Sequence, residues 1–247
     1  MSSCLIFGCI ILFIIPSLNN GFIAVSIATR RHNLFSETLS QGVYDQLTIS
    51  VGNHTIVSVE AEAGAPESQN APNLIRLTDI QSGWGNGAHP TTKLCLDFVS
   101  SVVQKGDSFL DYGTGSGILS ILAAKMGASK CMAVDIDEDS LRAARNNVIT
   151  NGVDDIIEVL HTKSIYLGDG SFSESDITVA NILPGALNRL VGTIWMLTKP
   201  GGIICLSGMR PHELGAIRSM YSPFVDLATE ETRQSSHELY GKMMALT

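Results

Sequence analysis

The segment 109–117 constrains the fold of this chain more than any other part of its sequence. It is a short apolar run that ends at Asp111 and then opens into a glycine-rich turn. The glycines of the turn occupy alternate positions: Gly113, Gly115 and Gly117. The residues that follow, 118–128, are rich in Ala, Leu and Ile and predict a helix. Glycine allows a positive φ and a close ligand, and the first turn of a helix presents free amide donors. A strand, a glycine turn and a helix in this order predict a cofactor site.

The spacing of these glycines narrows the choice of cofactor. In a dinucleotide fingerprint the third glycine comes three residues after the second, whereas here it comes two residues after. A P-loop is excluded because no Gly-Lys-Ser/Thr follows the turn. A turn of this kind beside an acid suits a ligand without phosphate, such as S-adenosylmethionine, which joins an amino acid, a sulfonium and a nucleoside. We expect Asp111 to accept a hydrogen bond from the α-ammonium group and the amides of Gly113, Gly115 and Gly117 to face this cofactor.

A second acidic position supports this interpretation. Residues 130–134 predict a second strand, which is followed by Asp135, Ile136 and Asp137. A carboxylate at the tip of the second strand is placed to accept hydrogen bonds from a ribose diol. The alternative is that either aspartate merely caps the helix predicted at 138–151. We assign the ribose contact to Asp135 and the helix cap to Asp137.

Length and charge limit the class of protein. A chain of 247 residues with 45% hydrophobic content accommodates one large α/β domain and a small appendage, and strand and helix patterns alternate from residue 107 onward. The formal net charge is −8, and no basic run or aromatic-basic pattern is present. These features argue against a dedicated nucleic-acid surface, and they remain compatible with a basic protein substrate.

The cysteine pattern indicates a reducing compartment and no metal site. The five cysteines include no Cys-x-x-Cys pair, and no metal-ligand spacing links them to histidines. Cys95, Cys131 and Cys205 lie in apolar runs, so we expect three buried free thiols.

The first residues of the chain have the composition of a targeting sequence. Residues 4–15 form an apolar run that is short for a membrane span and typical of a signal-peptide core. No acidic residue precedes Glu37, while Ser, Thr and Arg occur between 26 and 31. A signal-like segment followed by a transit-like segment, with Phe22 near the junction, predicts a bipartite plastid presequence over residues 1–32. The alternatives are mitochondrial import, a plain secretory signal and a membrane anchor.

Residues 33–74 predict a short β-containing extension and a linker. Apolar and polar side chains alternate over 47–62 around Gly52 and Asn53, which predicts a hairpin of two strands. The composition of 64–73, which includes two prolines, is that of a linker. No room is left here for a large substrate domain, and the main domain is expected to cover 75–247.

A glycine-rich loop precedes the first strand of the main domain. Residues 83–92 are Gly-Trp-Gly-Asn-Gly-Ala-His-Pro-Thr-Thr and lead into a helix predicted at 91–104. Such a loop can fold over a cofactor as a lid. His89 and Thr92 are therefore candidate site residues, and helix capping or packing is the alternative role for both.

A third segment completes the predicted site. Residues 176–180 predict a buried parallel strand, which is followed by Asn181 and by a helix predicted at 185–197. Ligands of open α/β sheets bind at the carboxyl ends of the strands, so Asn181 would lie beside the cofactor. Its amide can accept a hydrogen bond from an amine and can also donate one. The alternative is that Asn181 is a turn or capping residue of the next helix.

Taken together, these segments resemble the ribosomal protein L11 methyltransferases, the PrmA family. The resemblance rests on the motifs Gly-Asn-Gly-Ala-His-Pro-Thr-Thr, Asp-Tyr-Gly-Thr-Gly-Ser-Gly, Asp-Ile-Asp and Ala-Asn-Ile-Leu, in this order. It extends from Ile75 to the C-terminus. It implies a Rossmann-like α/β class I methyltransferase fold with a seven-stranded sheet and S-adenosyl-L-methionine as the methyl donor. It also implies that Thr92, Gly113, Asp135 and Asn181 contact the cofactor.

The sequence departs from the family pattern at three places. The loop at 84–89 reads Trp-Gly-Asn-Gly-Ala-His where the family has Phe-Gly-Thr-Gly-Thr-His, and Thr114 stands at a turn position that is normally Cys. The family also carries an N-terminal ferredoxin-like domain that captures the ribosomal protein, and this chain has a short, unlike segment in its place. The methyl donor is therefore better defined than the methyl acceptor.

The expected reaction is direct attack of a neutral amine on the S-methyl group, for which the protein mainly supplies position. An amine with a reference pKa of about 10.4 must first lose its proton, and the nearby sulfonium and desolvation favour this loss. We expect Asn181 to orient the amine and His89 to relay the proton, without a metal.

The expected partner is a protein substrate, with a ribosomal protein as the first candidate. The mature chain is expected to be a monomer that binds neither a membrane nor, stably, a nucleic acid. The alternatives are a methyltransferase for a small molecule or RNA, and a non-catalytic S-adenosylmethionine-binding factor.

Overall fold

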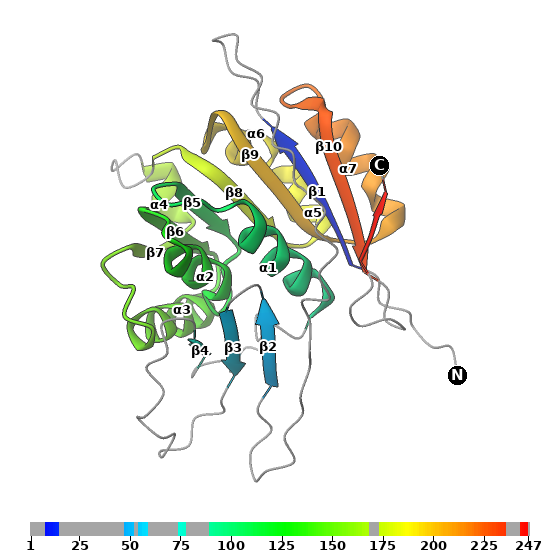
Figure 1. Cartoon of the computed structure of the whole chain (residues 1–247). Helices are drawn as coiled ribbons and strands as arrows, with labels where there is room; N and C mark the ends of the chain where they lie inside the picture. Colours follow the sequence, from blue (N-terminus) through cyan, green and yellow to red (C-terminus); the bar gives the residue numbers. More distant parts are fainter. Residues whose placement is uncertain are drawn as a thin grey trace.

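The computed structural model describes residues 8–14, 47–51, 54–58, 74–77, 89–167, 173–235 and 243–246. Their strands form one sheet of eight strands and one of three. The large sheet has the strand order β11-β10-β1-β9-β8-β5-β6-β7. Figure 1 shows this sheet at the centre of the fold, with helices on both of its faces.

Five neighbouring strands of the large sheet are parallel, as expected for a Rossmann-like α/β protein. In chain order they are β5 (Ser108–Tyr112), β6 (Lys130–Asp135), β7 (Ile157–His161), β8 (Ser175–Asn181) and β9 (Thr198–Met209). The chain runs outward from β5 to β7 and then returns to β8 on the other side of β5. The strand order therefore reverses at β5, and the carboxyl ends of β8, β5 and β6 form the switch point at which open α/β sheets bind ligands.

Helices connect these strands and cover both faces of the sheet (Figure 1). They are α1 (Pro90–Val102), α2 (Ile118–Met126), α3 (Glu138–Thr150), α4 (Lys163–Leu167), α5 (Pro184–Arg189), α6 (Val191–Met196) and α7 (Leu214–Tyr221), with the 3₁₀ turn η1 (Pro211–Glu213) before α7. None of the helices in the described parts of the chain has the length and apolar composition needed to cross a membrane.

Strand residues alternate between two hydrophobic clusters, one on each face of the sheet. Phe109 and Cys131 pack with residues of α1, α2 and α3, while Leu110 and Met132 pack with residues of α5, α6 and α7. Each large side chain buried in this way contributes about 1.5–3 kcal/mol relative to an exposed one. The three expected buried thiols, Cys95, Cys131 and Cys205, are confirmed as free and buried.

The predicted hairpin is present and belongs to a small second sheet. β2 (Leu47–Val51) and β3 (His54–Ser58) are antiparallel, and Val51 pairs with His54 across the predicted turn. β4 (Leu74–Leu77) adds to β3 in parallel. Val51, Ile75 and Leu77 are fully buried in the same hydrophobic cluster as α1 and α2, so the small sheet extends the core on that face. The predicted linker at 64–73 lies outside the described residues.

The large sheet has eight strands instead of the expected seven because the first residues of the chain supply one. β1 (Gly8–Ile14) lies between β9 and β10 (Asp226–Ser235) and is antiparallel to both; Ile11 pairs with Leu206 on one side and with Thr232 on the other. β11 (Met243–Leu246) pairs with the other edge of β10. The apolar run that was assigned to a targeting segment therefore also contains a strand, because such a run suits a sheet interior as well as a signal-peptide core.

The helix predicted at 185–197 is divided into α5 and α6. α5 closes at Leu190, whose N–H donates to the carbonyls of Ala186 and Leu187, and α6 begins at the next residue. Gly192 and its β-branched neighbours have low helix propensity, which explains the interruption. Pro184 opens α5 in its first turn.

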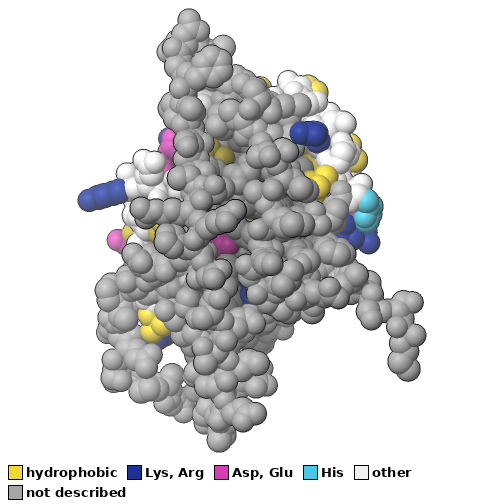
Figure 2. Space-filling model, turned by 45° about the vertical axis from the view of Figure 1, so that its right-hand side comes forward, with side chains coloured by type: hydrophobic (Ala, Val, Ile, Leu, Met, Phe, Trp, Pro, Cys, Tyr) yellow, Lys and Arg dark blue, Asp and Glu magenta, His cyan; other side chains and the backbone are white. Residues whose placement is uncertain are grey.

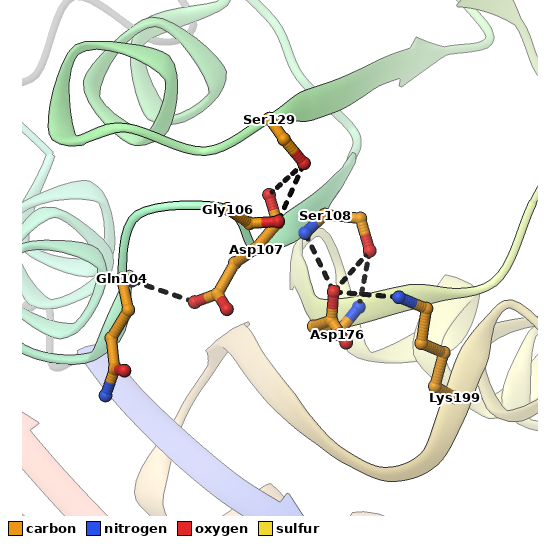
Figure 3. Close-up of polar contacts among 7 residues, drawn as sticks. All are labelled: Gln104, Gly106, Asp107, Ser108, Ser129, Asp176 and Lys199. Atoms are coloured by element: carbon orange, nitrogen blue, oxygen red, sulfur yellow. Dashed lines mark hydrogen bonds and ion pairs between the residues drawn. The ribbon is translucent and has the colours of Figure 1, made fainter.

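The amino ends of three parallel strands are tied together by polar contacts (Figure 3). Asp176 of β8 accepts hydrogen bonds from the N–H and the hydroxyl of Ser108 on β5, at 2.8 and 2.6 Å, and from Lys199 of β9 at 2.9 Å. Burial raises the pKa of Asp176, but the hydrogen bonds from Lys199 and Ser108 outweigh this effect and lower it. These contacts hold the sheet at the edge opposite to the switch point.

Candidate functional site

The glycine turn between β5 and α2 lies at the switch point. Gly113, Gly115 and Gly117 have φ angles of 84°, 54° and 84°, a left-handed region that favours glycine. The amides of Gly113 and Thr114 donate to the carbonyl of Val134, so the turn is fastened to β6. Gly117 offers no side chain to cap α2, and the N–H of Ser120 in its first turn donates to Asp111. The alternate glycines thus give the backbone the conformation for which they were singled out.

Asp111, the acid on β5 beside this turn, is fully buried. Its Oδ2 accepts hydrogen bonds from Thr114 Oγ1 at 2.7 Å and from Ser120 Oγ at 3.1 Å. Its Oδ1 has no hydrogen-bond partner among the described residues. The pKa of Asp111 is raised to about 6, because burial and the charge of Asp135 raise it by more than the hydrogen bonds from Thr114 and Ser120 lower it. A buried carboxylate with one unpaired oxygen is suited to a cationic ligand group, because such a group supplies the missing partner.

Asp135 ends β6 and directs its carboxylate to the surrounding backbone. Oδ2 accepts from the N–H of Gly115 at 3.0 Å, and Oδ1 accepts from the N–H groups of Ile136 and Asp137 at 2.7 and 3.0 Å. A carboxylate has about four acceptor positions, so one position on Oδ2 stays open. The neighbouring Asp137 accepts from the N–H of Ser140 at 2.9 Å and is the N-cap of α3, as predicted.

His89 is the N-cap of α1. Its Nδ1 accepts from the N–H of Thr91 at 3.4 Å and lies 2.7 Å from the hydroxyl oxygen of Thr91. Burial lowers the pKa of His89, so the ring is neutral at pH 7. With Nδ1 as the acceptor, the ring proton lies on Nε2, and the basic nitrogen of the ring is the one that Thr91 already occupies. This geometry favours the capping role of His89 over that of a base. The predicted lid, 83–88, lies outside the described residues.

Thr92, in the first turn of α1, faces the end of β8. Asn181 Nδ2 donates a hydrogen bond to Thr92 Oγ1 at 3.4 Å. Thr92 is buried and Asn181 is partly buried. The other end of the amide, Asn181 Oδ1, receives no hydrogen bond from the described residues. The structure therefore joins two segments that the sequence analysis singled out separately.

Three further residues shape the site without having been predicted. Ser120 supplies a buried donor to Asp111, and Asn147 Nδ2 on α3 donates to the carbonyl of Ser116 in the glycine turn at 2.9 Å. The sequence signal for Asn147 is a polar residue on the apolar face of a helix, among residues such as Ala144 that are buried. Ile136 is 75% exposed beside Asp135 and offers an apolar surface at the same edge.

The groups at this edge fit an amino-acid nucleoside such as S-adenosylmethionine. The unpaired Oδ1 of Asp111 matches an ammonium group, and the open position on Asp135 Oδ2 matches a ribose hydroxyl. Two carboxylates at one glycine turn repel a phosphate, which agrees with the interpretation of the glycine spacing. Over the described ranges, no three His, Cys, Asp or Glu side chains are grouped so that they could hold a metal ion.

Comparison with known proteins identifies one family. Residues 48–242 match the sequence model of the family described as "Ribosomal protein L11 methyltransferase (PrmA)". The match begins before Ile75, where the resemblance was expected to start, and so includes β3 and all but the first residue of β2.

Individual proteins named ribosomal protein L11 methyltransferase are similar to this chain. The protein of Neisseria meningitidis serogroup C is 40% identical over 178 residues, which cover 72% of this chain and 57% of that protein. The protein of Burkholderia mallei is 39% identical over 166 residues, which cover 66% of this chain and 53% of that protein. The chain therefore spans little more than half the length of these relatives.

A solved structure shares the fold. The crystal structure of the ribosomal protein L11 methylase from Lactobacillus delbrueckii subsp. bulgaricus is 31% identical in sequence and has a TM-score of 0.56 to this chain. The similarity covers 71% of this chain and 86% of that one.

Proposed function

The chain belongs to the ribosomal protein L11 methyltransferase (PrmA) family, and on this basis we propose that it is an S-adenosylmethionine-dependent methyltransferase that acts on protein amines. The observation that carries the proposal is the convergence of Asp111, Asp135 and Asn181 on three neighbouring strand ends. The first two carry the negative charge that a cationic, phosphate-free donor requires. The third presents a neutral amide acceptor beside them, which suits an amine.

The donor is held by the glycine turn and its two carboxylates. Asp111 Oδ1 accepts from the α-ammonium group. The N–H groups of Gly113, Gly115 and Gly117 were expected to face the cofactor, but they donate to Val134, Asp135 and Thr114, so the glycines supply the shape of the turn and not its donors. Asp135 accepts one ribose hydroxyl at its open position, and a second hydroxyl replaces one of its backbone donors. The exposed side chain of Ile136 lies against the base. When bound, S-adenosylmethionine supplies an electrophilic methyl group on a sulfonium, which is a good leaving group.

The acceptor amine is held by Asn181. Its Oδ1 accepts an N–H of the neutral amine, and the hydrogen bond from its Nδ2 to Thr92 Oγ1 decides which end of the amide faces the amine. His89 supports this arrangement as the cap of α1, since that cap fixes the helical turn on which Thr92 lies. In this scheme the rate enhancement comes from holding the amine and the methyl donor in position, without a metal ion.

We propose a ribosomal protein as the acceptor, modified on lysine side chains or at its N-terminus. The names of the relatives support this choice, and the net charge of −8 favours a basic partner. In Figure 2 the described Lys and Arg side chains of the visible face stand at separate places on its two sides.

A methyl-transfer assay tests the proposal. The purified protein is incubated with methyl-labelled S-adenosylmethionine and either purified ribosomal protein L11 or an organelle extract, and the products are digested with protease or with nuclease. We expect label on L11 that protease releases and nuclease leaves intact. Label released only by nuclease, or no label on any macromolecule, contradicts the proposal.

Two variants test the assignment of the donor and acceptor sides. Asp135→Ala should weaken binding of S-adenosylhomocysteine by at least about tenfold, because hydrogen bonds to a charged group are lost. Asn181→Ala should lower turnover while binding stays within about threefold of wild type. Asp139→Ala serves as a control, since Asp139 is an exposed aspartate of α3 whose side chain pairs with Arg142, away from the glycine turn. Normal activity of both site variants contradicts the assignment.

We also propose that residues 1–32 direct the chain to a plastid and that the mature enzyme is a monomer. The apolar run at 4–15 and the absence of acids before Glu37 support the targeting role. The full chain, tagged at its C-terminus, should accumulate in the plastid of an algal cell with a new N-terminus near residue 32, as read by N-terminal sequencing. Retention in the cytosol with residue 1 intact contradicts the proposal.

A further inference from the structure

The short turn at the end of β8, residues 181–183, is held between two glycines from different parts of the sheet. Gly113 follows β5 and Gly208 lies near the end of β9, and their φ angles are 84° and 89°. Both glycines lie against Ile182, the central residue of the turn. These contacts are separate from the polar contacts of the site described above.

At Gly113 the contact is with the side chain of Ile182. A Cβ atom on Gly113 would overlap Ile182 Cγ2, so only glycine leaves room for this methyl group. The same Cβ would lie 3.9 Å from the carbonyl oxygen of Asn181. The side chain of Ile182 therefore rests on the first glycine of the cofactor turn.

At Gly208 the contact is with the backbone of Ile182. A Cβ atom there would overlap the Ile182 carbonyl oxygen and would lie 2.9 Å from its carbonyl carbon and 3.1 Å from its nitrogen. Gly208 follows Ser207, which pairs with Asn181 between β8 and β9. A second strand thus limits where the backbone of the turn can lie, and a collision with backbone cannot be relieved by a rotamer change.

We infer that Ile182 and Gly208 are positioning residues of the methyl-transfer site, an inference that rests on the proposed function. Gly208 fixes the backbone of the turn, and Ile182 packs the turn on Gly113. Together they set the place of Asn181 relative to the methyl donor. A misplacement of about 1 Å at reacting groups can cost on the order of 10²-fold in rate. A larger residue in place of Gly208 therefore affects turnover more than donor binding, because the donor is held by Asp111 and Asp135, which lie on other strands.

Gly106 offers a matched control for Gly208. It also has a positive φ, 98°, and a Cβ on it would meet nothing within 4 Å. Alanine at Gly106 therefore measures the strain of a positive φ alone, whereas alanine at Gly208 adds the collision with Ile182.

The first experiment compares Gly208→Ala with Gly106→Ala. Turnover is measured on ribosomal protein L11, and binding of S-adenosylhomocysteine is measured by calorimetry. Gly208→Ala should lower kcat by at least about tenfold and change the Kd by less than about threefold. Gly106→Ala should leave kcat and Kd within about twofold of wild type, even if it lowers the melting temperature. Equal kcat values for the two variants would overturn the inference.

The second experiment uses the different partners of the two glycines. Ile182→Ala removes Cγ2 but leaves the backbone, so it should recover part of the binding and thermal stability lost in Gly113→Ala. It should recover nothing in Gly208→Ala. Ile182→Val keeps a branched methyl group and should retain kcat within about threefold, whereas Ile182→Ala alone should not. Equal recovery in both glycine backgrounds, or in neither, would overturn the inference.

A spectroscopic measurement separates this inference from the proposed function. In protein with labelled isoleucine methyl groups, the Ile182 signal is identified by its absence in Ile182→Val. It should shift when S-adenosylhomocysteine is added, and it should already differ in ligand-free Gly208→Ala. If the wild-type protein transfers no methyl group to any protein, the proposed function fails while this measurement still decides the packing of Ile182. An Ile182 signal that is insensitive to the ligand and to Gly208→Ala overturns the positioning role.

Discussion

Asn181 Nδ2 donates to Thr92 Oγ1 at 3.4 Å, and this hydrogen bond joins the end of β8 to the first turn of α1. The distance is at the long end for an N–H···O hydrogen bond, so the contact contributes little to global stability. Its effect is orientational: with Nδ2 bound to the helix, Oδ1 is the atom left to face an acceptor.

Thr92→Val removes this acceptor and keeps the shape of the side chain. We expect kcat/KM on ribosomal protein L11 to fall by about two- to tenfold, the range of one neutral hydrogen bond, with little change in melting temperature. Thr92→Ser keeps the hydroxyl and should remain close to wild type. An equal loss in Thr92→Ser would show that packing of the methyl group, and not the hydrogen bond, is what matters.

The raised pKa of Asp111 predicts that binding of the methyl donor depends on pH. Burial raises its pKa to about 6 in the ligand-free protein, so below that pH the carboxyl is protonated and no longer attracts an ammonium group. Affinity for S-adenosylhomocysteine should therefore fall as the pH drops through about 6 and level off above it. Calorimetry over this range measures the effect. Asp111→Asn should bind more weakly and without this dependence, and a flat profile for the wild type would contradict the prediction.

The raised pKa of Asp111 affects folding stability in the opposite direction to donor binding. The folded protein holds this proton more tightly than the unfolded chain does, so Asp111 costs stability at neutral pH and less as the pH falls from about 6 toward its unfolded value. Ligand binding and stability should thus move in opposite directions over this interval, and Asp111→Asn should remove both trends.

His89→Asn tests whether this residue acts as a cap or as a proton relay. Asparagine is a strong N-cap, so the variant should keep both its stability and its kcat within about twofold of wild type. His89→Ala should lose about 0.5–2 kcal/mol of stability, as uncapped helices do. A large fall in kcat for His89→Asn, together with a changed pH–rate profile, would instead support His89 as a proton relay.

Removal of residues 1–32 should leave a folded protein, because β11 can replace β1. Ser235 of β10 pairs with Gly8 on one edge and with Met243 on the other, and Thr232 pairs with Ile11 and with Leu246, so both strands run in the same direction. We expect deletion of 243–247 to have a small effect on the melting temperature of the full chain and a much larger one on the truncated chain. Additive effects would show that β11 does not move into the vacated place.

Local features of the site were predictable from the sequence. The alternate glycines at 113–117, the cap at Asp137 and the hairpin before His54 all depend on residues close together in the chain, and the structure confirms their conformations. The burial of the three cysteines also followed from their apolar surroundings.

Features that depend on distant contacts were not predictable. Gly208 stands in an ordinary apolar strand pattern, and only its positive φ and its approach to Ile182, which the structure reveals, explain why it is glycine. The break at Leu190 depends on weak propensities that a continuous apolar stripe conceals. β1 was missed because an apolar run carries no information about its partner strands.

The position of β1 also sets an order of events. Cys9 pairs with Met209, so β1 can enter the sheet only after the chain has been made as far as β9. Pairing between segments so far apart in the sequence is also intrinsically slow. If residues 1–32 direct the chain to an organelle, as proposed above, then delivery and completion of the sheet require the same residues, and the faster of the two processes decides where the chain ends up.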